Sequence, residues 1–299
     1  MSATSREGQT YAGVSRLVRY VNLVKLPHTV FALPFALVGV TLASWIAPVT
    51  AALVIWVVIA FTAARFAAMG FNRIADRRFD ALNPRTAMRE IPSGTLSVPE
   101  AAASVMVASL VFFFAAWRIN PLCFSLSPVA LGWVLFYSYT KRFTRWAHLV
   151  LGLGLGIAPA GGYLAVTGTW SDPWWLLPTL AVAVMSWVGG FDILYSLPDA
   201  DFDRSQGLHS VPATMGTRTS LRVARALHAL TVLSLAAAGV ASGSGVLYFA
   251  GVVVAAGILG WEHSLVSSDD LSKLDAAFFS VNGILSVTFF LFVLAERVF

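Results

Sequence analysis

The sequence predicts an all-α membrane protein, a bundle of about nine transmembrane helices that forms a single domain over residues 1–299. Hydrophobic residues make up 58% of the chain and charged residues only 12%, and the mean hydropathy is +0.75. These values lie outside the range of ordinary water-soluble domains. Long apolar segments agree with this, since a helix needs about 20 apolar residues to cross about 30 Å of hydrocarbon.

Nine apolar segments approach or exceed that length, and they define the predicted helices. The first follows a polar N-terminal segment, residues 1–26, and has no clear cleavage site, so we expect it to remain as a span. No low-complexity segment or long soluble linker divides the chain, which is why one domain is expected. The predicted spans are residues 27–45, 50–70, 98–117, 120–138, 147–166, 173–194, 220–241, 244–262 and 275–296.

Basic residues predict how these helices are oriented. Lys and Arg gather before the first span and after the second, fourth and sixth, whereas the first, third, fifth and seventh loops carry only Arg118. The positive-inside rule therefore places the N-terminus in the cytoplasm of a multi-pass protein of the cell inner (plasma) membrane. This distribution accounts for the net charge of +5 without nucleic acid, which is not an expected partner. Cys123 is the only cysteine, so no intrachain disulfide is possible.

A first acidic motif lies at the cytoplasmic end of the second predicted span. Asn72, Asp76 and Asp80 recur at i, i+4 and i+8, so on a helix they share one face. Carboxylate and carbonyl oxygens stacked at one-turn intervals suit a hard cation such as Mg²⁺, which also binds phosphate readily. The sequence therefore predicts metal ligands here.

A second acidic motif, with Asp192, Asp199 and Asp203, follows the sixth predicted span on the same side. Pro198 lies between these acids and should kink or stop the helix, so they are expected on a turn and not on a straight face. Whether Asp192 is a direct ligand or only supports the others is open at this stage.

The two motifs are related by a constant offset, which predicts a pseudo-repeat of parallel halves. Taken singly, each motif reads as solvated acids that pair with neighbouring arginines. Two matching copies on one membrane side favour a joint site for Mg²⁺ and a diphosphate, because a bound cation relieves the repulsion among several carboxylates. At an offset of 123 positions, Asn72, Asp76 and Asp80 align with Tyr195, Asp199 and Asp203.

Basic side chains that could neutralise a diphosphate occur on the same side. Lys141 and Arg142 follow the fourth predicted span, and Arg85 and Arg89 follow the first motif at helical spacing. Arg65 lies within a predicted span, two turns before Asn72, and should point into the bundle, since an arginine in hydrocarbon costs about 2.5 kcal/mol or more. Its partner is either structural or the carboxylate of a substrate.

Two other features are assigned no chemistry. The run with Gly152, Gly154 and Gly156 lacks the strand and turn of a nucleotide-binding loop, so it predicts close helix packing. The five histidines, among them His148, show no ligand spacing.

The motifs resemble those of the UbiA-type intramembrane aromatic prenyltransferases, in particular the 4-hydroxybenzoate polyprenyltransferases and their menaquinone-pathway relatives. The resemblance spans nearly the whole chain. It rests on the first motif with the following Asn83-Pro84-Arg85-Thr86, on Tyr139-x-Lys141-Arg142, and on Asp192-x2-Tyr195-x3-Asp199-x3-Asp203.

The resemblance implies a bundle with a central cavity open to lipid and to the cytoplasm. It implies Mg²⁺ as cofactor, polyprenyl diphosphate and an aromatic acid as substrates, and the lipid bilayer as the surroundings of the isoprenoid chain. Asp76, Asp199, Lys141 and Tyr139 are the implied catalytic residues, and Arg77 joins the diphosphate-binding cations. The implied metal ligands are Asn72, Asp76, Asp80, Asp192, Asp199 and Asp203.

The expected reaction is Mg-dependent transfer of a polyprenyl group to a hydroxylated aromatic acid such as 4-hydroxybenzoate in quinone biosynthesis. A naphthoate acceptor is an alternative within the same class. A secondary transporter with a cytoplasmic cation site is an alternative from another class, although transport sites usually lie near the bilayer midplane.

Overall fold

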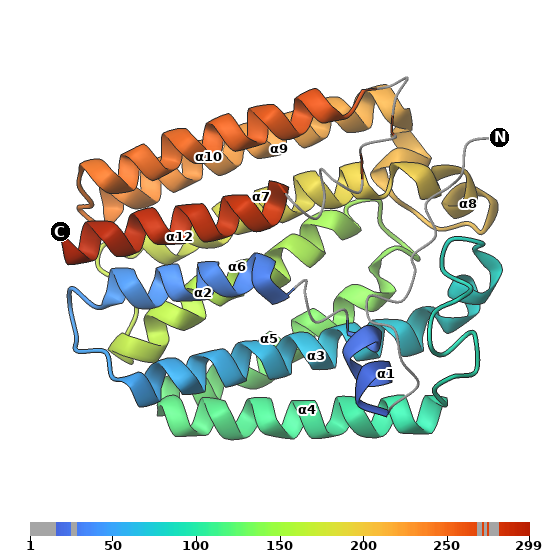
Figure 1. Cartoon of the computed structure of the whole chain (residues 1–299), viewed down its shortest axis with the longest axis horizontal. Coiled ribbons are helices and arrows are strands. Elements are labelled where there is room, and N and C mark those ends of the chain that lie inside the picture. Colours follow the sequence, from blue (N-terminus) through green and yellow to red (C-terminus); the bar gives the residue numbers. More distant parts are fainter. Residues whose placement is uncertain (1–15, 25–28, 268–270, 272–273, 275–280) are drawn as a thin grey trace.

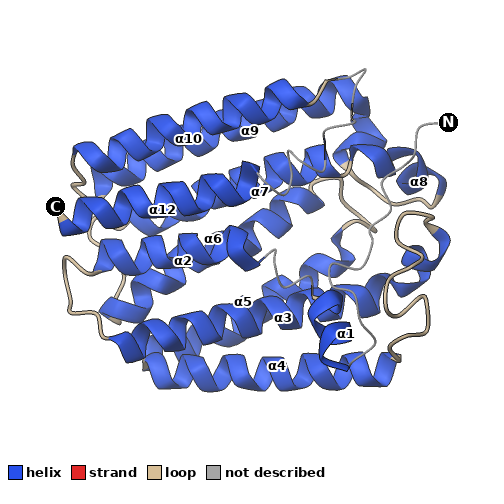
Figure 2. Cartoon of the chain, viewed as in Figure 1, coloured by secondary structure: helices blue, strands red, loops and turns tan. Residues whose placement is uncertain are grey.

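The computed structural model describes residues 16–24, 29–267, 271, 274 and 281–299, and every regular element in these residues is helical (Figures 1 and 2). The longer helices run side by side along the bundle, and α8 lies at the end opposite the C-terminus (Figure 1). The elements are α1 (Arg16–Leu23), α2 (Thr29–Ala43), α3 (Ala51–Leu82), α4 (Val98–Ile119), α5 (Pro121–Thr140), α6 (Ala147–Thr167), α7 (Leu176–Tyr195), η2 (Leu197–Asp199), α8 (Ala200–Ser205), α9 (Val211–Ala241), α10 (Val246–Leu265) and α12 (Asn282–Val298).

Seven of the described helices, α3 to α7, α9 and α10, are long and apolar enough to cross a membrane. They confirm seven of the nine predicted spans. The helices at the other two positions are shorter, with 15 residues in α2 and 17 in α12. The predictions 27–45 and 275–296 also include residues outside the described part of the chain.

Local capping explains where several helices begin. Thr50, Asn120 and Ser210 each accept a hydrogen bond from a backbone N–H in the first turn of α3, α5 and α9. At α4, Ser97 and Glu100 form a reciprocal capping box. These caps satisfy backbone donors that a helix start otherwise leaves unpaired.

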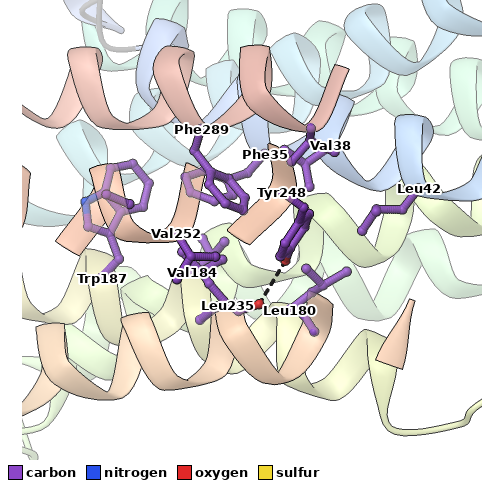
Figure 3. Packing of buried hydrophobic residues seen from close by; sticks show 14 of the residues in the cluster. Phe35, Val38, Leu42, Leu180, Val184, Trp187, Leu235, Tyr248, Val252 and Phe289 are labelled. Carbon is purple, nitrogen blue, oxygen red and sulfur yellow. Dashed lines mark hydrogen bonds between the residues drawn. The ribbon is translucent and has the colours of Figure 1, made fainter. Parts of the chain in front are cut away.

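The apolar core is centred on α7, which packs there against α2, α6, α9, α10 and α12. Figure 3 shows the rings of Phe35 and Trp187 close to one another, and their centroids are 5.0 Å apart. In the same view, the buried Tyr248 hydroxyl donates to the Leu235 carbonyl at 2.9 Å, which satisfies its polar end within the apolar interior.

Glycines bring α6 close to α7. A side chain at Gly152 would collide with the backbone of Met185, and one at Gly156 would collide with that of Ala181. The predicted role of the glycine run in helix packing is therefore confirmed.

The break predicted at Pro198 is also confirmed. The α7 helix ends at Tyr195, a short 3₁₀ turn spans Leu197–Asp199, and α8 begins at Ala200. Asp192 therefore stays on α7, whereas Asp199 and Asp203 follow the break, in the 3₁₀ turn and on α8.

Candidate functional site

A cavity of about 240 Å³ lies among the ends of α3, α5 and α7 and the short helix α8. Both acidic motifs line it, which confirms that they meet on one side of the bundle. All six predicted metal ligands and five of the predicted cationic residues are in the lining, namely Asn72, Asp76, Asp80, Asp192, Asp199, Asp203, Arg65, Arg85, Arg89, Lys141 and Arg142.

The first motif lies on one continuous helix, as its spacing predicts. Asn72 donates from Nδ2 to Asp76 Oδ2 at 3.0 Å, one turn away. Asp80 is 6% exposed, and its Oδ1 accepts from Arg89 Nη1 at 2.6 Å. Within the described residues, its Oδ2 is buried and has no hydrogen-bond donor.

The second motif is spread over three elements. Asp192 lies in the last turn of α7, Asp199 ends the 3₁₀ turn, and Asp203 lies on α8. Arg85 Nη1 lies 2.6 Å from Asp199 Oδ2, and Asn83 Nδ2 donates to Asp199 Oδ1 at 3.1 Å. The loop that follows the first motif thus binds an acid of the second.

The loop after α5 supplies cations to both motifs. Lys141 Nζ lies 3.9 Å from Asp203 Oδ2, and Arg142 Nη2 lies 3.5 Å from Asp76 Oδ1. Burial alone would lower the pKa of Lys141, but Asp203, Asp192 and the other nearby carboxylates outweigh it and hold that pKa above its usual value. Lys141 is therefore a permanent cation at neutral pH.

Two predicted site residues do not reach the cavity lining. Arg77 donates to the backbone carbonyl of Ile74 at 2.8 Å, in the preceding turn of α3. Tyr139 is 40% exposed and contacts Phe71 edge-on, with ring centroids 5.9 Å apart. The guanidinium of Arg142 covers the Tyr139 ring at 4.7 Å.

Three further residues of the site were not among the predicted diphosphate and metal ligands. Asn83 caps the C-terminus of α3 while it contacts Asp199. Tyr195 lines the cavity and carries the Arg85 guanidinium 4.3 Å above its ring. His148 contacts Asp192 from another helix. Asn83 and Tyr195 stand within the quoted motifs, whereas no sequence signal marks His148.

The acidic residues provide a donor set that fits Mg²⁺. Within the described residues, no three His, Cys, Asp or Glu side chains converge closely enough to hold a metal by themselves. However, Asp80 Oδ2 and Asp203 Oδ2 are buried oxygens without a hydrogen-bond donor in that part of the chain. Mg²⁺ commonly takes one or two carboxylates and completes its shell with waters and substrate phosphates, so these residues suit a cation that arrives with a diphosphate.

Comparison with known proteins gives consistent matches. The UbiA prenyltransferase family matches residues 32–292. A 4-hydroxybenzoate octaprenyltransferase from Nitrosococcus oceani is 31% identical over 279 residues, which cover 92% of this chain and 95% of the relative. The apo structure of a UbiA homolog from Aeropyrum pernix K1 is 34% identical, with a TM-score of 0.82 over 90% of this chain and 98% of the homolog.

A more distant structure shares the fold. It is that of a UbiA homolog from Archaeoglobus fulgidus bound to DMAPP and Mg²⁺, with 19% identity and a TM-score of 0.69. The match covers 94% of this chain and 99% of the homolog.

Proposed function

The chain belongs to the UbiA prenyltransferase family, and we propose that it transfers a polyprenyl group from a polyprenyl diphosphate to a hydroxylated aromatic acid such as 4-hydroxybenzoate. The reaction is Mg-dependent and serves respiratory quinone biosynthesis. One observation carries the proposal: two acidic motifs and the cations between them line a single cavity. The match over residues 32–292 sets aside the transporter alternative.

The diphosphate end of the substrate would bind among the paired charges. Asn72 and the five acids would hold Mg²⁺, which when bound draws negative charge from the diphosphate and makes pyrophosphate a better leaving group. Lys141, Arg142, Arg85 and Arg89 would donate to the remaining phosphate oxygens, because guanidinium and ammonium groups make strong charge-assisted hydrogen bonds with phosphate. Arg77 and Tyr139 are left out of this assignment, since they do not line the cavity.

The acceptor would bind deeper, near Arg65. Arg65 shares the cavity lining with Met69, Leu151 and Leu155, so a planar guanidinium adjoins an apolar surface suited to an aromatic ring. The guanidinium of Arg65 would donate two parallel hydrogen bonds to the carboxylate of the acceptor. The electron-rich ring carbon of the acceptor then forms the bond to the prenyl C1 as pyrophosphate leaves, and the ring loses a proton.

The membrane arrangement completes the proposal. In this proposal, α2 and α12 would join the seven long helices to give nine spans in the cell inner membrane. The N-terminus and the cavity mouth would lie in the cytoplasm. A lateral opening to lipid would let the isoprenoid chain stay in the bilayer while its diphosphate meets the two motifs.

Product analysis by mass spectrometry tests the function. Purified protein given a polyprenyl diphosphate and 4-hydroxybenzoate should form a prenylated acid only with Mg²⁺. Replacement of a metal ligand should lower turnover by about 100-fold or more. Even the loss of a residue that only hydrogen-bonds to a metal ligand commonly lowers metal affinity or activity by about 10- to 100-fold. We expect this lower turnover of Asp76→Ala and Asp199→Ala.

Asp201→Ala is the matched control. Asp201 lies two residues from Asp199, but its side chain is 96% exposed and pairs with Arg204 outside the cavity lining. Unchanged turnover in Asp76→Ala and Asp199→Ala would contradict the metal assignment. A parallel panel of hydroxylated benzoates and naphthoates identifies the acceptor, since both classes offer the carboxylate that Arg65 would bind.

A further inference from the structure

We propose that His148 is a positioning residue, which holds one oxygen of Asp192 and thereby presents the other oxygen to the cation and diphosphate. This inference rests on the proposed function. It also answers how Asp192, which precedes the break at Pro198, takes part in the site.

The hydrogen bonds of His148 determine its tautomer. His148 is in the first turn of α6 and is fully buried, at 0% exposed. Its Nε2 accepts from the backbone N–H of Val211 at 3.3 Å, and a backbone N–H can only donate. The ring proton of the neutral imidazole is therefore on Nδ1, which lies 2.6 Å from Asp192 Oδ2 and donates to it.

The partner of Asp192 differs in kind from the partners of the other acids. Asp80 and Asp199 pair with Arg89 and Arg85, and these arginines line the cavity, where a diphosphate would compete for them. His148 is not in the cavity lining and has a single proton on Nδ1. The hydrogen bond from His148 to Asp192 therefore persists when substrate binds. Arg85 and Arg89, in contrast, can exchange their carboxylate partners for phosphate oxygens.

This fixed bond determines how Asp192 can act. With Oδ2 held by His148, the carboxylate cannot rotate freely about its side-chain bonds, and Oδ1 is the oxygen left for a cation. Outer-shell hydrogen bonds of this kind orient metal ligands, and their loss commonly weakens metal binding by about 10- to 100-fold. The same imidazole joins α6 to the end of α7 and to Val211, the first residue of α9.

Two substitutions separate the two hydrogen bonds of His148. His148→Asn places an amide nitrogen where Nδ1 stands, so it can still donate to Asp192. His148→Gln places its amide near Nε2, so it can keep the contact with Val211 and loses that with Asp192. A purely structural role predicts similar effects from both variants.

The experiment measures Mn²⁺ binding to the full-length protein in detergent, in the presence of inorganic pyrophosphate. Electron paramagnetic resonance of Mn²⁺ is the readout. His148→Gln should raise the dissociation constant for Mn²⁺ by about 10-fold or more, whereas His148→Asn should stay close to wild type. In an Asp192→Asn background, His148→Gln should cause no further change, because its effect passes through that carboxylate. Thermal unfolding identifies any variant that fails to fold.

Equal weakening by both variants, or an undiminished effect of His148→Gln in the Asp192→Asn background, would overturn the inference. If His148→Gln does not fold, His148→Asn is compared in the wild-type and the Asp192→Asn backgrounds. It must leave the dissociation constant for Mn²⁺ unchanged in both, and a weaker binding of Mn²⁺ in either would overturn the inference. The readout needs no acceptor and no turnover. Wild-type protein that binds Mn²⁺ with pyrophosphate but gives no prenylated product would therefore count against the proposed function and not against this inference.

Discussion

Each acid of the two motifs has a partner from another part of the chain. Arg89 reaches back nine residues to Asp80, whereas Arg85 pairs with Asp199 across 114 positions. These pairs offset the cost of placing several carboxylates in a partly buried cavity, where unpaired charges would be costly. They also place guanidinium groups where a diphosphate would need them, so substrate binding is expected to exchange carboxylate partners for phosphate partners.

Spacing on a helix explains why Tyr139 misses the cavity. Tyr137 lines it near the end of α5, and Lys141, four residues later, lines it as well. A residue two positions after Tyr137 is turned by about 200° around the helix axis, so Tyr139 faces away. Spacing alone shows that Tyr137 and Tyr139 lie on different faces of α5. It does not show which of these faces is turned toward the cavity.

Arg65 provides a test of acceptor recognition. Arg65→Gln should raise the KM for the aromatic acid about 10-fold or more and leave the KM for the diphosphate nearly unchanged, because hydrogen bonds to charged groups contribute about 1.5–3 kcal/mol. Steady-state kinetics with each substrate varied in turn measures both constants.

A phenol without the carboxylate is the control acceptor for this variant. Wild-type protein should prefer the acid, and Arg65→Gln should lose that preference. An equal loss of rate with both acceptors would assign Arg65 a structural role.

At the scale of elements, two helices present the motifs in different ways. The α3 helix continues to Leu82, twelve residues beyond the predicted span 50–70, and carries Asn72, Asp76 and Asp80 on one face. The α7 helix ends at Tyr195, so the later acids come from a turn and from α8. The two copies of the pseudo-repeat thus reach one cavity through different local structure.

The packing of α6 against α7 supports this arrangement, and a glycine pair tests it. Gly152→Ala should lower the free energy of unfolding by about 1–3 kcal/mol, because the new methyl group collides with the backbone of Met185. Thermal unfolding in detergent measures the change.

Gly161→Ala on the same helix is the matched control, since nothing lies within 4 Å of the position its methyl group would take. It should unfold at the wild-type temperature or slightly above, because alanine favours a helix. Equal stability of the two variants would contradict the close approach of α6 and α7.

At the scale of the whole molecule, the acidic motifs are gathered at one end of the bundle. The α8 helix lies at that end, and the C-terminus lies at the other (Figure 1). The loop between α6 and α7, with Trp170 53% exposed, lies at the end of α7 opposite to Asp201. These two exposed positions therefore report on opposite membrane sides.

Cysteine labelling tests the orientation. In a Cys123→Ser background, Trp170→Cys should react with a membrane-impermeant maleimide added to intact cells, and Asp201→Cys should react only in inverted vesicles. The opposite pattern would reverse the proposed topology. Labelling after detergent solubilisation, where both positions should react, is the control for accessibility.

The sequence by itself determined the features that depend on local periodicity and composition. Apolar length predicted the seven long helices, the i, i+4, i+8 spacing predicted the shared face of the first motif, and Pro198 predicted the end of α7. Each of these three features follows from the geometry of a helix over a few turns, and that geometry depends on residues close together in the sequence.

Only the tertiary structure decided which distant groups meet. The pairing of Arg85 with Asp199 and the contact of His148 with Asp192 join residues 114 and 44 positions apart. The position of Tyr139 outside the cavity depends on how α5 is rotated against its neighbours. Helix rotation and docking result from the packing of many side chains at once, so no single motif encodes them.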